Sequence, residues 1–529
     1  MTHDFSSWFR EQLVAGNIPT IVAERHYPED IPCFDIPSEQ WNDMAKLAKQ
    51  QSLRLVAEWA ADEHAMQFSG FSLYAAFAHR DHGYGLVRTM ITEDSSEFPS
   101  IVNHYPAASR MERTIHDFFG LVPMGHPDLR NWIKHEHWPE DTQPLRKDFN
   151  ADSTLPRVQG RYPFIEAEGE GVYQIPVGPV HAGIIEPGHF RFLAVGENIL
   201  NMEERLGYVH KGIEKRMEGR DVYAASRLAA RISGDATVAH SWAFCQAAEY
   251  AAHLTVPARA TTLRAVLCER ERMANHIGDI GTICNDAAWT FMHMQCQRLR
   301  EDMARQHRNI FGHRLMMDLV VPGGFKTDIS TEDVLKLIEQ TRAVTAEVKR
   351  LHEIYQDHTP IRERVVDSGR INKDDAVELG LLGYTGRSIN MDLDARRDAA
   401  YAPFADMQVK IPVCNGGDVA ARLWVRFEEI VESAWLIEDL LTTLPEGPTQ
   451  VEWKQPTLGN SGFAVVESWR GEIATWVRFG EDDLLDRCYV RDPSMINWLA
   501  LELAVRDIPV PDFPLNNKSF NCSYSGHDM

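Results

Sequence analysis

The segment RISGDATVAH, residues 231–240, lies inside a longer run, 225–254, whose residues are apolar or small on nearly every side. A helix that is apolar around its whole circumference belongs in the middle of a bundle rather than at a surface. Arg231 and His240 bracket the segment with polar, ionisable side chains. The segment therefore predicts a helical core in which polar groups are embedded.

Helical periodicity continues on both sides of this segment and makes the larger, C-terminal part of the chain mainly helical. The helical patterns cover 203–217, 222–253, 258–285, 288–311, 331–357 and 418–443. A strand pair at 176–199 precedes them, and short strands return at 460–498.

The first 150 residues mix both kinds of periodicity. FSLYAAFAH (71–79) and GYGLVRTMIT (83–92) are apolar, aromatic and β-branched enough to form strands, and SEQWNDMAKLAKQQ (38–51) is an amphipathic helix. Proline, glycine and acidic residues without periodicity then indicate a linker that lies over a surface. We predict an α+β fold in three parts: an α+β domain at 1–150, a linker at 151–175 and a mainly helical domain at 176–529.

Composition excludes several classes of function. A formal net charge of -23 argues against nucleic acid as a partner, because phosphate backbones repel an acidic chain. The 8 cysteines form no C-x-x-C pair, which argues against a disulfide framework and against a zinc or iron–sulfur site built from this chain alone. Neither a signal peptide nor a run of ~18 apolar residues is present, so we expect a cytoplasmic protein.

Three further segments resemble known families. GHPDLR and PLRKDF, within 112–149, resemble the 30-kilodalton subunit of respiratory complex I. PVGPVHAGIIEPGHFRF (176–192) and GYVHKGIEKRMEG (207–219) resemble the start of the large subunit shared by nickel–iron hydrogenases and complex I. LCERERMANHIGDIGTICNDA (267–287) is similar to membrane-bound, energy-converting hydrogenases. The whole chain resembles the fused large subunit of the formate hydrogenlyase and hydrogenase-4 type, a 30-kilodalton-like domain joined to a 49-kilodalton-like, hydrogenase-fold domain.

The opening segment also resembles a metal site, but one whose ligands are missing. With Cys in place of Ser233 and Ala236 it would read Arg-x-Cys-Gly-x-Cys-x-x-x-His, the first half of a nickel–iron site. Matched from its end, the tail NKSFNCSYSGHDM (517–529) places Ser523 and Gly526 at the second pair of thiolate positions. Nickel and iron need soft, deprotonated thiolates. We therefore expect no metal in this chain, and the four residues are expected to line a vacated cavity.

Other residues of that cavity keep the identity that the resemblance implies. Glu186 falls where hydrogenases place a proton-relaying carboxylate, and we add His189 beside it to the candidate catalytic residues. Arg231 and Arg470 would stabilise negative charge, and His240 would donate or position a hydrogen bond. The alternative is that these side chains form only a buried ion-pair network.

The resemblance predicts an electron- and proton-coupling subunit of a membrane-bound, complex-I-like oxidoreductase without hydrogenase activity. It implies three kinds of partner: a small iron–sulfur subunit like the 20-kilodalton subunit of complex I, a ferredoxin-like iron–sulfur subunit, and antiporter-like membrane subunits. The iron–sulfur cluster would lie in the adjacent partner, and the chain would reach the inner face of the cell membrane only through its partners. The resemblance makes a quinone one possible electron acceptor in the cavity. It also implies NAD as a cofactor of the complex-I-like class, although no G-x-G-x-x-G motif follows a strand in this chain.

Three alternatives remain open. The chain would contain nickel and iron if it were the large subunit of an active hydrogenase. It would be non-enzymatic if it served as a structural coupler of an ion- or inorganic-carbon-transporting complex. A quinone reductase of the complex I kind is the third, and Ile185 stands where that class has a second histidine.

Overall fold

A computed structural model of the chain describes residues 5–22, 31–66, 68–181 and 185–529. Its N-terminal part is a sheet in the order β1-β2-β5-β4-β3, in which only β2 and β5 pair in parallel. The sequence prediction of strands at 71–79 and 83–92 is confirmed, since β4 is Gly70–His79 and β5 is Gly83–Thr92. The other elements here are α1 (Phe5–Ala15), β1 (Ile21–Val22), β2 (Cys33–Asp35), α2 (Trp41–Gln50), β3 (Arg54–Asp62), β6 (Glu97–Pro99), α3 (Ala108–Phe119) and β7 (Val122–Met124).

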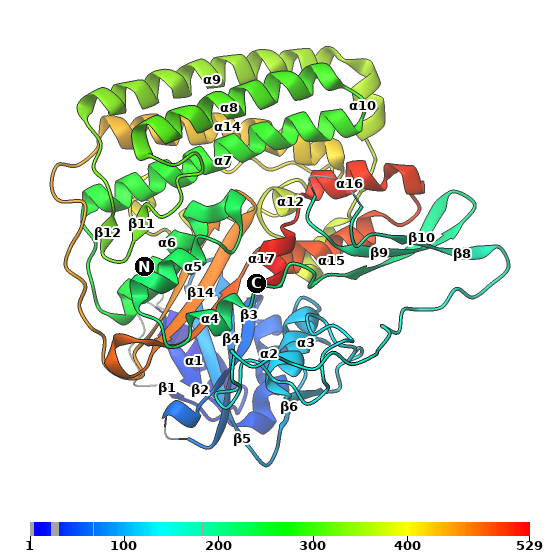
Figure 1. Ribbon diagram of the computed structural model, residues 1–529, viewed down its shortest axis with the longest axis vertical. Helices are drawn as coiled ribbons and strands as arrows, with labels where there is room; N and C mark the ends of the chain where they lie inside the picture. Colours follow the sequence, from blue (N-terminus) through cyan, green and yellow to red (C-terminus); the bar gives the residue numbers. More distant parts are fainter. Residues whose placement is uncertain (1–4, 23–30, 67, 182–184) are drawn as a thin grey trace.

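Residues 151–171 form neither helix nor strand, and most of them are exposed. They lead into a projecting three-stranded antiparallel sheet of β8 (Val172–Val177), β9 (His189–Val195) and β10 (Asn198–Arg205), at the right of Figure 1. The predicted helix at 203–217 is wrong over its first half, because β10 continues to Arg205 and only α4 (Ile213–Met217) is helical. Pairing with β9 fixes this strand, and Glu204 bonds the buried Arg110 of α3 at 2.8 Å.

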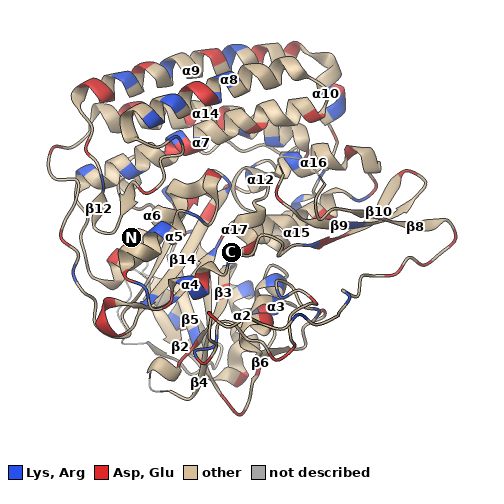
Figure 2. Ribbon diagram, in the orientation of Figure 1, with Lys and Arg blue, Asp and Glu red and all other residues tan. Residues whose placement is uncertain are grey.

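Four long helices form one layer at the top of Figure 1. They are α7 (Ala258–Asp286), α8 (Thr290–Phe311), α9 (Thr331–Asp357) and α14 (Val419–Thr442), within a few residues of the predicted ranges. Charges of both signs decorate the outer helices α8 and α9 (Figure 2), as expected of solvent-facing surfaces. No helix in the described parts of the chain combines the length and the apolar character that crossing a bilayer requires.

The predicted helix at 222–253 is interrupted. It is α5 (Val222–Ala229) and α6 (Thr237–Ala251), separated by an extended Ser233 and a 3-10 turn at Gly234–Ala236. Serine, glycine and aspartate are weak helix formers, which favours a break at this position. Their side chains and backbone can then form polar contacts with other segments instead of hydrogen bonds within a helix.

Helix α6 is buried on nearly every side, as predicted, but it packs on a sheet rather than inside a bundle. It lies against β13 (Ser461–Ser468) and β14 (Gly471–Phe479), which pair with β15 (Leu485–Arg491). A Cβ on Gly462 would lie 2.0 Å from the carbonyl oxygen of Ala247, so glycine permits this close approach.

The β13–β15 sheet also packs on the N-terminal sheet. Arg54 of β3 donates two hydrogen bonds to Glu472 of β14, at 2.6 and 2.8 Å, and Trp59 stacks on Tyr489 with ring centroids 5.0 Å apart. The remaining elements are β11 (Val320–Val321), β12 (Gly324–Phe325), α10 (Thr359–Val365), α11 (Lys373–Leu379), α12 (Gly383–Arg387), α13 (Ala395–Asp398), α15 (Ser494–Ala504), α16 (Phe513–Phe520) and α17 (Tyr524–Asp528).

Candidate functional site

A cavity of about 600 Å³ lies where the helical layer, the β13–β14 hairpin and the C-terminal tail meet. Helix α7 lines it with Asn275, Gly278, Asp279 and Thr282, whose spacing places them on one helix face. Helix α8 contributes His293, Gln297 and Arg300 at the same kind of spacing. The other lining residues are Ile185, Glu186, Ser233, Gly234, Asp235, Arg470, Lys518, Asn521, Cys522, Ser523, Tyr524 and Ser525.

Two of the four positions expected to be vacant of thiolates meet directly in this cavity. The hydroxyl oxygens of Ser233 and Ser523 are 3.0 Å apart, although the residues are separated by 290 positions in the sequence. Ser233 also donates to Asp235 at 2.6 Å, and Ser523 accepts from the backbone N–H of Gly526 at 2.9 Å as the N-cap of α17. One hydroxyl–hydroxyl contact therefore joins the two halves of the site, and the other two hydrogen bonds fix each hydroxyl within its own segment.

The other two positions lie behind the cavity wall. Ala236 is buried and packs with Tyr384 and Trp469. A Cβ on Gly526 would lie 2.5 Å from Oδ2 of Asp492, so a side chain at this position would displace that carboxylate. Neither residue belongs to the cavity lining.

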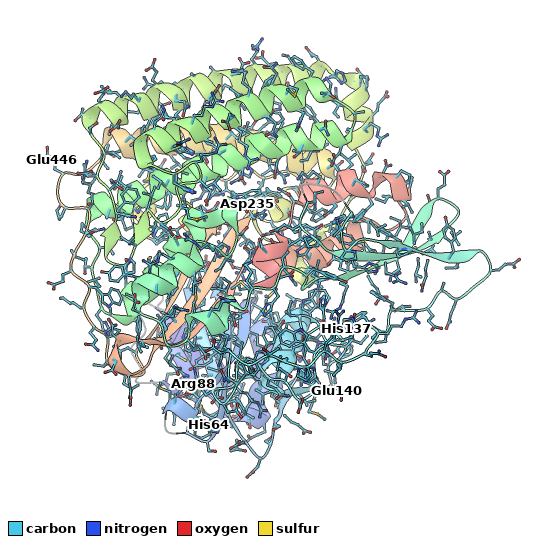
Figure 3. The ribbon with its side chains drawn as sticks, viewed as in Figure 1. His64, Arg88, His137, Glu140, Asp235 and Glu446 are labelled. Carbon is cyan, nitrogen blue, oxygen red and sulfur yellow. The ribbon has the colours of Figure 1, made fainter. Side chains whose placement is uncertain are left out.

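An ion pair that the sequence did not single out dominates the cavity. Arg470 donates to both carboxylate oxygens of Asp235, at 2.8 and 2.7 Å, and its Nε donates to the carbonyl of Asn521 at 2.6 Å. Burial alone would raise the pKa of Asp235, but the charge and hydrogen bonds of Arg470 hold it well below its usual value. Figure 3 shows Asp235 below the helical layer, near the middle of the molecule. The pair stays ionised at neutral pH and is neutral as a whole.

Glu186 and His240 occupy different depths. Glu186 is exposed at the cavity rim, where its Oε2 accepts from the N–H of Ser525 at 3.0 Å. His240 is fully buried behind the lining, and its Nε2 lies 3.0 Å from Oδ2 of Asp492. Burial would raise the pKa of Asp492, but the hydrogen bond from His240 lowers it below its usual value.

Two predicted site residues lie elsewhere. Arg231 has a side chain that is 43% exposed and forms an ion pair with Asp318, with its nearest nitrogen 2.5 Å from a carboxylate oxygen. It turns outward after the end of α5, because Asp318 and the carbonyl of Arg227 satisfy its guanidinium there. His189 is buried at the start of β9, where its Nδ1 is 3.2 Å from the carbonyl of Gly178. Neither residue lines the cavity.

Several polar residues of the site were missed at the level of the sequence. Asp279 accepts from Asn521 at 2.7 Å and from Arg426 at 3.3 Å, and Asn275 donates to the backbone carbonyl of Asp235 at 2.7 Å. Their four-residue spacing on α7 was the available signal, but an apolar helix pattern does not reveal which face meets a cavity.

The donor set does not suit a nickel–iron centre. Cys522 is the thiol on the lining, and burial raises its pKa above the usual value, which favours the protonated form over a metal-binding thiolate. Within the described ranges no cluster of three or more His, Cys, Asp or Glu side chains is arranged to hold a metal ion. Serine hydroxyls and an amide-rich wall do not replace four soft thiolates.

Comparisons with known proteins agree with the fused architecture. Residues 34–155 match the family of the respiratory-chain NADH dehydrogenase 30 Kd subunit, and 286–462 match that of its 49 Kd subunit. Residues 211–278 match the nickel-dependent hydrogenase family. Hydrogenase-4 component G of Escherichia coli (strain K12) is 34% identical over 447 residues, which are 84% of this chain and 78% of that protein.

The chain belongs to the family of hydrogenase-4 component G. Formate hydrogenlyase subunit 5 of the same organism is 31% identical, over 84% of this chain and 79% of its own length. A solved structure of a membrane-bound sulfane sulfur reductase, an archaeal respiratory membrane complex, shares the fold with a TM-score of 0.64. That match is 22% identical and covers 68% of this chain and 99% of the other. The predicted α+β fold and the predicted resemblance to the fused large subunit are confirmed.

Proposed function

We propose that this chain is the electron- and proton-coupling subunit of a membrane-bound oxidoreductase complex related to complex I, and that it works without a nickel–iron centre. The observation that carries the proposal is the contact between the hydroxyls of Ser233 and Ser523. These residues stand where the resemblance puts one thiolate from each end of the subunit, and their hydroxyls, which are poor ligands for nickel and iron, contact each other.

Charge stabilisation is the chemistry that the cavity offers. The Arg470 side chain is only 4% exposed and its charge is neutralised by Asp235, so its fixed N–H donors, rather than a free charge, would stabilise negative charge that develops in the cavity. Burial lowers the pKa of Arg470 and Asp235 raises it; the outcome is a pKa above the usual value, so the charge does not titrate.

Proton exchange would take place at the rim. Glu186 is open to solvent and bonds the backbone of the C-terminal tail, so it is placed to pass protons between solvent and the cavity. His240 and Asp492 form a buried hydrogen-bonded pair one layer further in. In this proposal the hydroxyl contact of Ser233 and Ser523 joins the two segments in place of a metal, Ala236 and Gly526 pack behind the cavity wall, and Arg231 and His189 have structural roles outside the cavity.

The proposal includes the partners that the resemblance implies. A small iron–sulfur subunit would deliver electrons beside the cavity, and antiporter-like membrane subunits would attach this chain to the inner face of the membrane. Relatives named as hydrogenase-4, formate hydrogenlyase and NADH-quinone oxidoreductase subunits support such an assembly.

Metal analysis of the purified intact complex tests the first half of the proposal. We expect nickel far below one atom per complex, and stoichiometric nickel with hydrogen turnover would establish the active-hydrogenase alternative instead. A substitution tests the second half. Glu186→Gln should lower redox-driven proton transport in membrane vesicles, whereas Glu197→Gln, an exposed change in the β9–β10 turn, should leave it unchanged. Equal transport by both variants would favour a purely structural coupler.

A further inference from the structure

The cavity lining carries three carboxylates, Glu186, Asp235 and Asp279, and three cations, Arg300, Arg470 and Lys518, but not every cation is paired with an acid. Asp235 is paired with Arg470 and also interacts electrostatically with Arg300 without contacting it, and Asp279 is paired with Arg426 and accepts from Asn521. Two further cations, Arg300 and Lys518, also line the cavity. Across the described ranges, no carboxylate lies within ion-pair distance of either one.

Arg300 is held in place without being satisfied. A Cβ on Gly278 would lie 3.0 Å from Cδ, 3.2 Å from Nε and 3.3 Å from Nη1 of Arg300, so the side chain lies flat across α7 where α7 has no side chain. Its one recorded hydrogen bond within the described chain is a long one, 3.4 Å from Nη2 to the side-chain oxygen of Asn275. A guanidinium carries five N–H donors, so most of its donor capacity is left for a ligand.

Neighbouring polar groups share this side of the cavity. His293 and Gln297 precede Arg300 on the same face of α8, and all three line the cavity. The Nδ1 atom of His293 is shielded from solvent, and no hydrogen-bond partner for it is found in the described chain. Lys518 reaches the cavity from α16, and its charge also acts on the exposed Asp286. A buried ring nitrogen without a partner is costly unless a ligand or water bonds it.

We propose that this side of the cavity binds a small anion with two coplanar oxygens, of the carboxylate or nitrate type, with Arg300 as its principal contact. The planar fork of a guanidinium matches two coplanar oxygens, whereas an ammonium acts as a point charge. Lys518 adds positive charge, and His293 and Gln297 supply further hydrogen bonds. The proposal deepens the proposed function and rests on it, because an anion fits here only if a metal centre does not fill the cavity.

Equilibrium binding by the full-length chain tests this inference without turnover. Nitrate serves as an inert planar probe and acetate as a carboxylate, at constant ionic strength set with sodium chloride, and calorimetry reports the dissociation constant. We expect saturable binding of both anions by the unmodified chain. The dissociation constant of Arg300→Gln should be about tenfold higher or more, as expected when charge-assisted hydrogen bonds are removed. Arg300→Lys should fall between the two, since it keeps the charge and loses the fork.

Arg298→Gln is the matched control. Arg298 lies two residues away on α8, is 52% exposed and contacts Asp302 and Glu347 on the outer face. This variant should bind nitrate within about twofold of the unmodified chain, as expected for a surface change. If Arg300→Gln does not fold, Gly278→Ala is the second variant, because the added methyl group would lie 3.0 Å from Cδ of Arg300 and should shift that side chain by a few tenths of an ångström and so weaken binding.

Three results would overturn the inference: no saturable binding by the unmodified chain, equal affinity of that chain and Arg300→Gln, or displacement of nitrate by sulfate at equal concentration. The last result would indicate a site that selects charge alone. These outcomes are separable from the tests of the proposed function. Nickel content and the effect of Glu186→Gln on proton transport are measured on the complex and do not depend on nitrate binding.

Discussion

The contact between Ser233 and Ser523 predicts that cysteines placed at these two positions will form a disulfide between the two halves of the site. If both are replaced by Cys, their sulfur atoms start about as close as the present hydroxyl oxygens, which are 3.0 Å apart. A small adjustment of side-chain torsions then brings them to the ~2.05 Å of a disulfide. The experiment uses a Cys522→Ala background, because Cys522 is adjacent to the new thiol and lines the same cavity.

The size of the effect follows from the loop that the bond would close. The two residues are 290 positions apart, and closing so long a loop removes roughly 5–6 kcal/mol of unfolded-state entropy in the chain-entropy description. Unfolding entropy of about 2.1 cal/mol/K per residue over 529 residues converts this into a rise of roughly 5 °C in the midpoint, if the chain unfolds as one unit. Strain in the new bond would reduce the gain.

Mass spectrometry of peptides after mild oxidation checks the bond, and thermal unfolding with and without a reductant checks the stabilisation. The two single Cys variants serve as controls and should show neither effect. Two free thiols that react fully with a maleimide after oxidation would refute the reasoning, because the positions would then be further apart than the structure places them.

Two other predictions concern stability. The pKa of Glu472 is lowered to about 2, because the charges of Arg54 and Arg491 outweigh the cost of burial; its ordinary value is 4.5. A lowered pKa contributes stability that is complete above pH 4.5 and is lost as the pH falls towards 2. The midpoint of thermal unfolding of Glu472→Gln should therefore depend less on pH in this acid range than that of the unmodified chain. Glu378→Gln, which removes an exposed charge from the same domain contact, should leave this pH dependence unchanged. Gly462→Ala should lower the free energy of unfolding by roughly 1–3 kcal/mol, because the added methyl group forces α6 away from the sheet. Gly234→Ala is the control: its methyl group would meet nothing within 4 Å, so its midpoint of thermal unfolding should be nearly unchanged.

Local patterns were sufficient to predict several of the regular elements, although not the end of β10 or the break between α5 and α6. Strands β4 and β5 could be predicted because apolar and β-branched residues fill them, and helix α9 because its apolar residues recur with helical periodicity. These signals act over a few residues. They therefore appear in the sequence whether or not distant segments are known.

The interior of the site could be predicted only in part. The resemblance pointed to Ser233, Ser523, Glu186 and Arg470, and all four line the cavity. It did not indicate that Asp235 would be the partner of Arg470, because the two are 235 positions apart.

The directions in which the side chains point could not be predicted from the sequence either. The outward turn of Arg231 depends on Asp318, which approaches from 87 positions away, and the inward face of α8 depends on where the C-terminal tail lies. Spacing along a helix shows which side chains share a face but not what that face meets. Long-range contacts decided every part of the site that the sequence left open.

Arg470 explains how the cavity keeps its shape. Its terminal nitrogens bind Asp235, in the segment that supplies one half of the site, and its Nε binds the carbonyl of Asn521, in the tail that supplies the other half. The hydroxyl contact of Ser233 and Ser523 joins the same two segments a short distance away. The buried Arg470 thus holds the two chain segments together through charge and hydrogen bonds, as a metal ion with ligands from both segments would do through coordination. We infer that these contacts keep the cavity open without a set of thiolate ligands, and that the space beside Arg300 is available to a ligand.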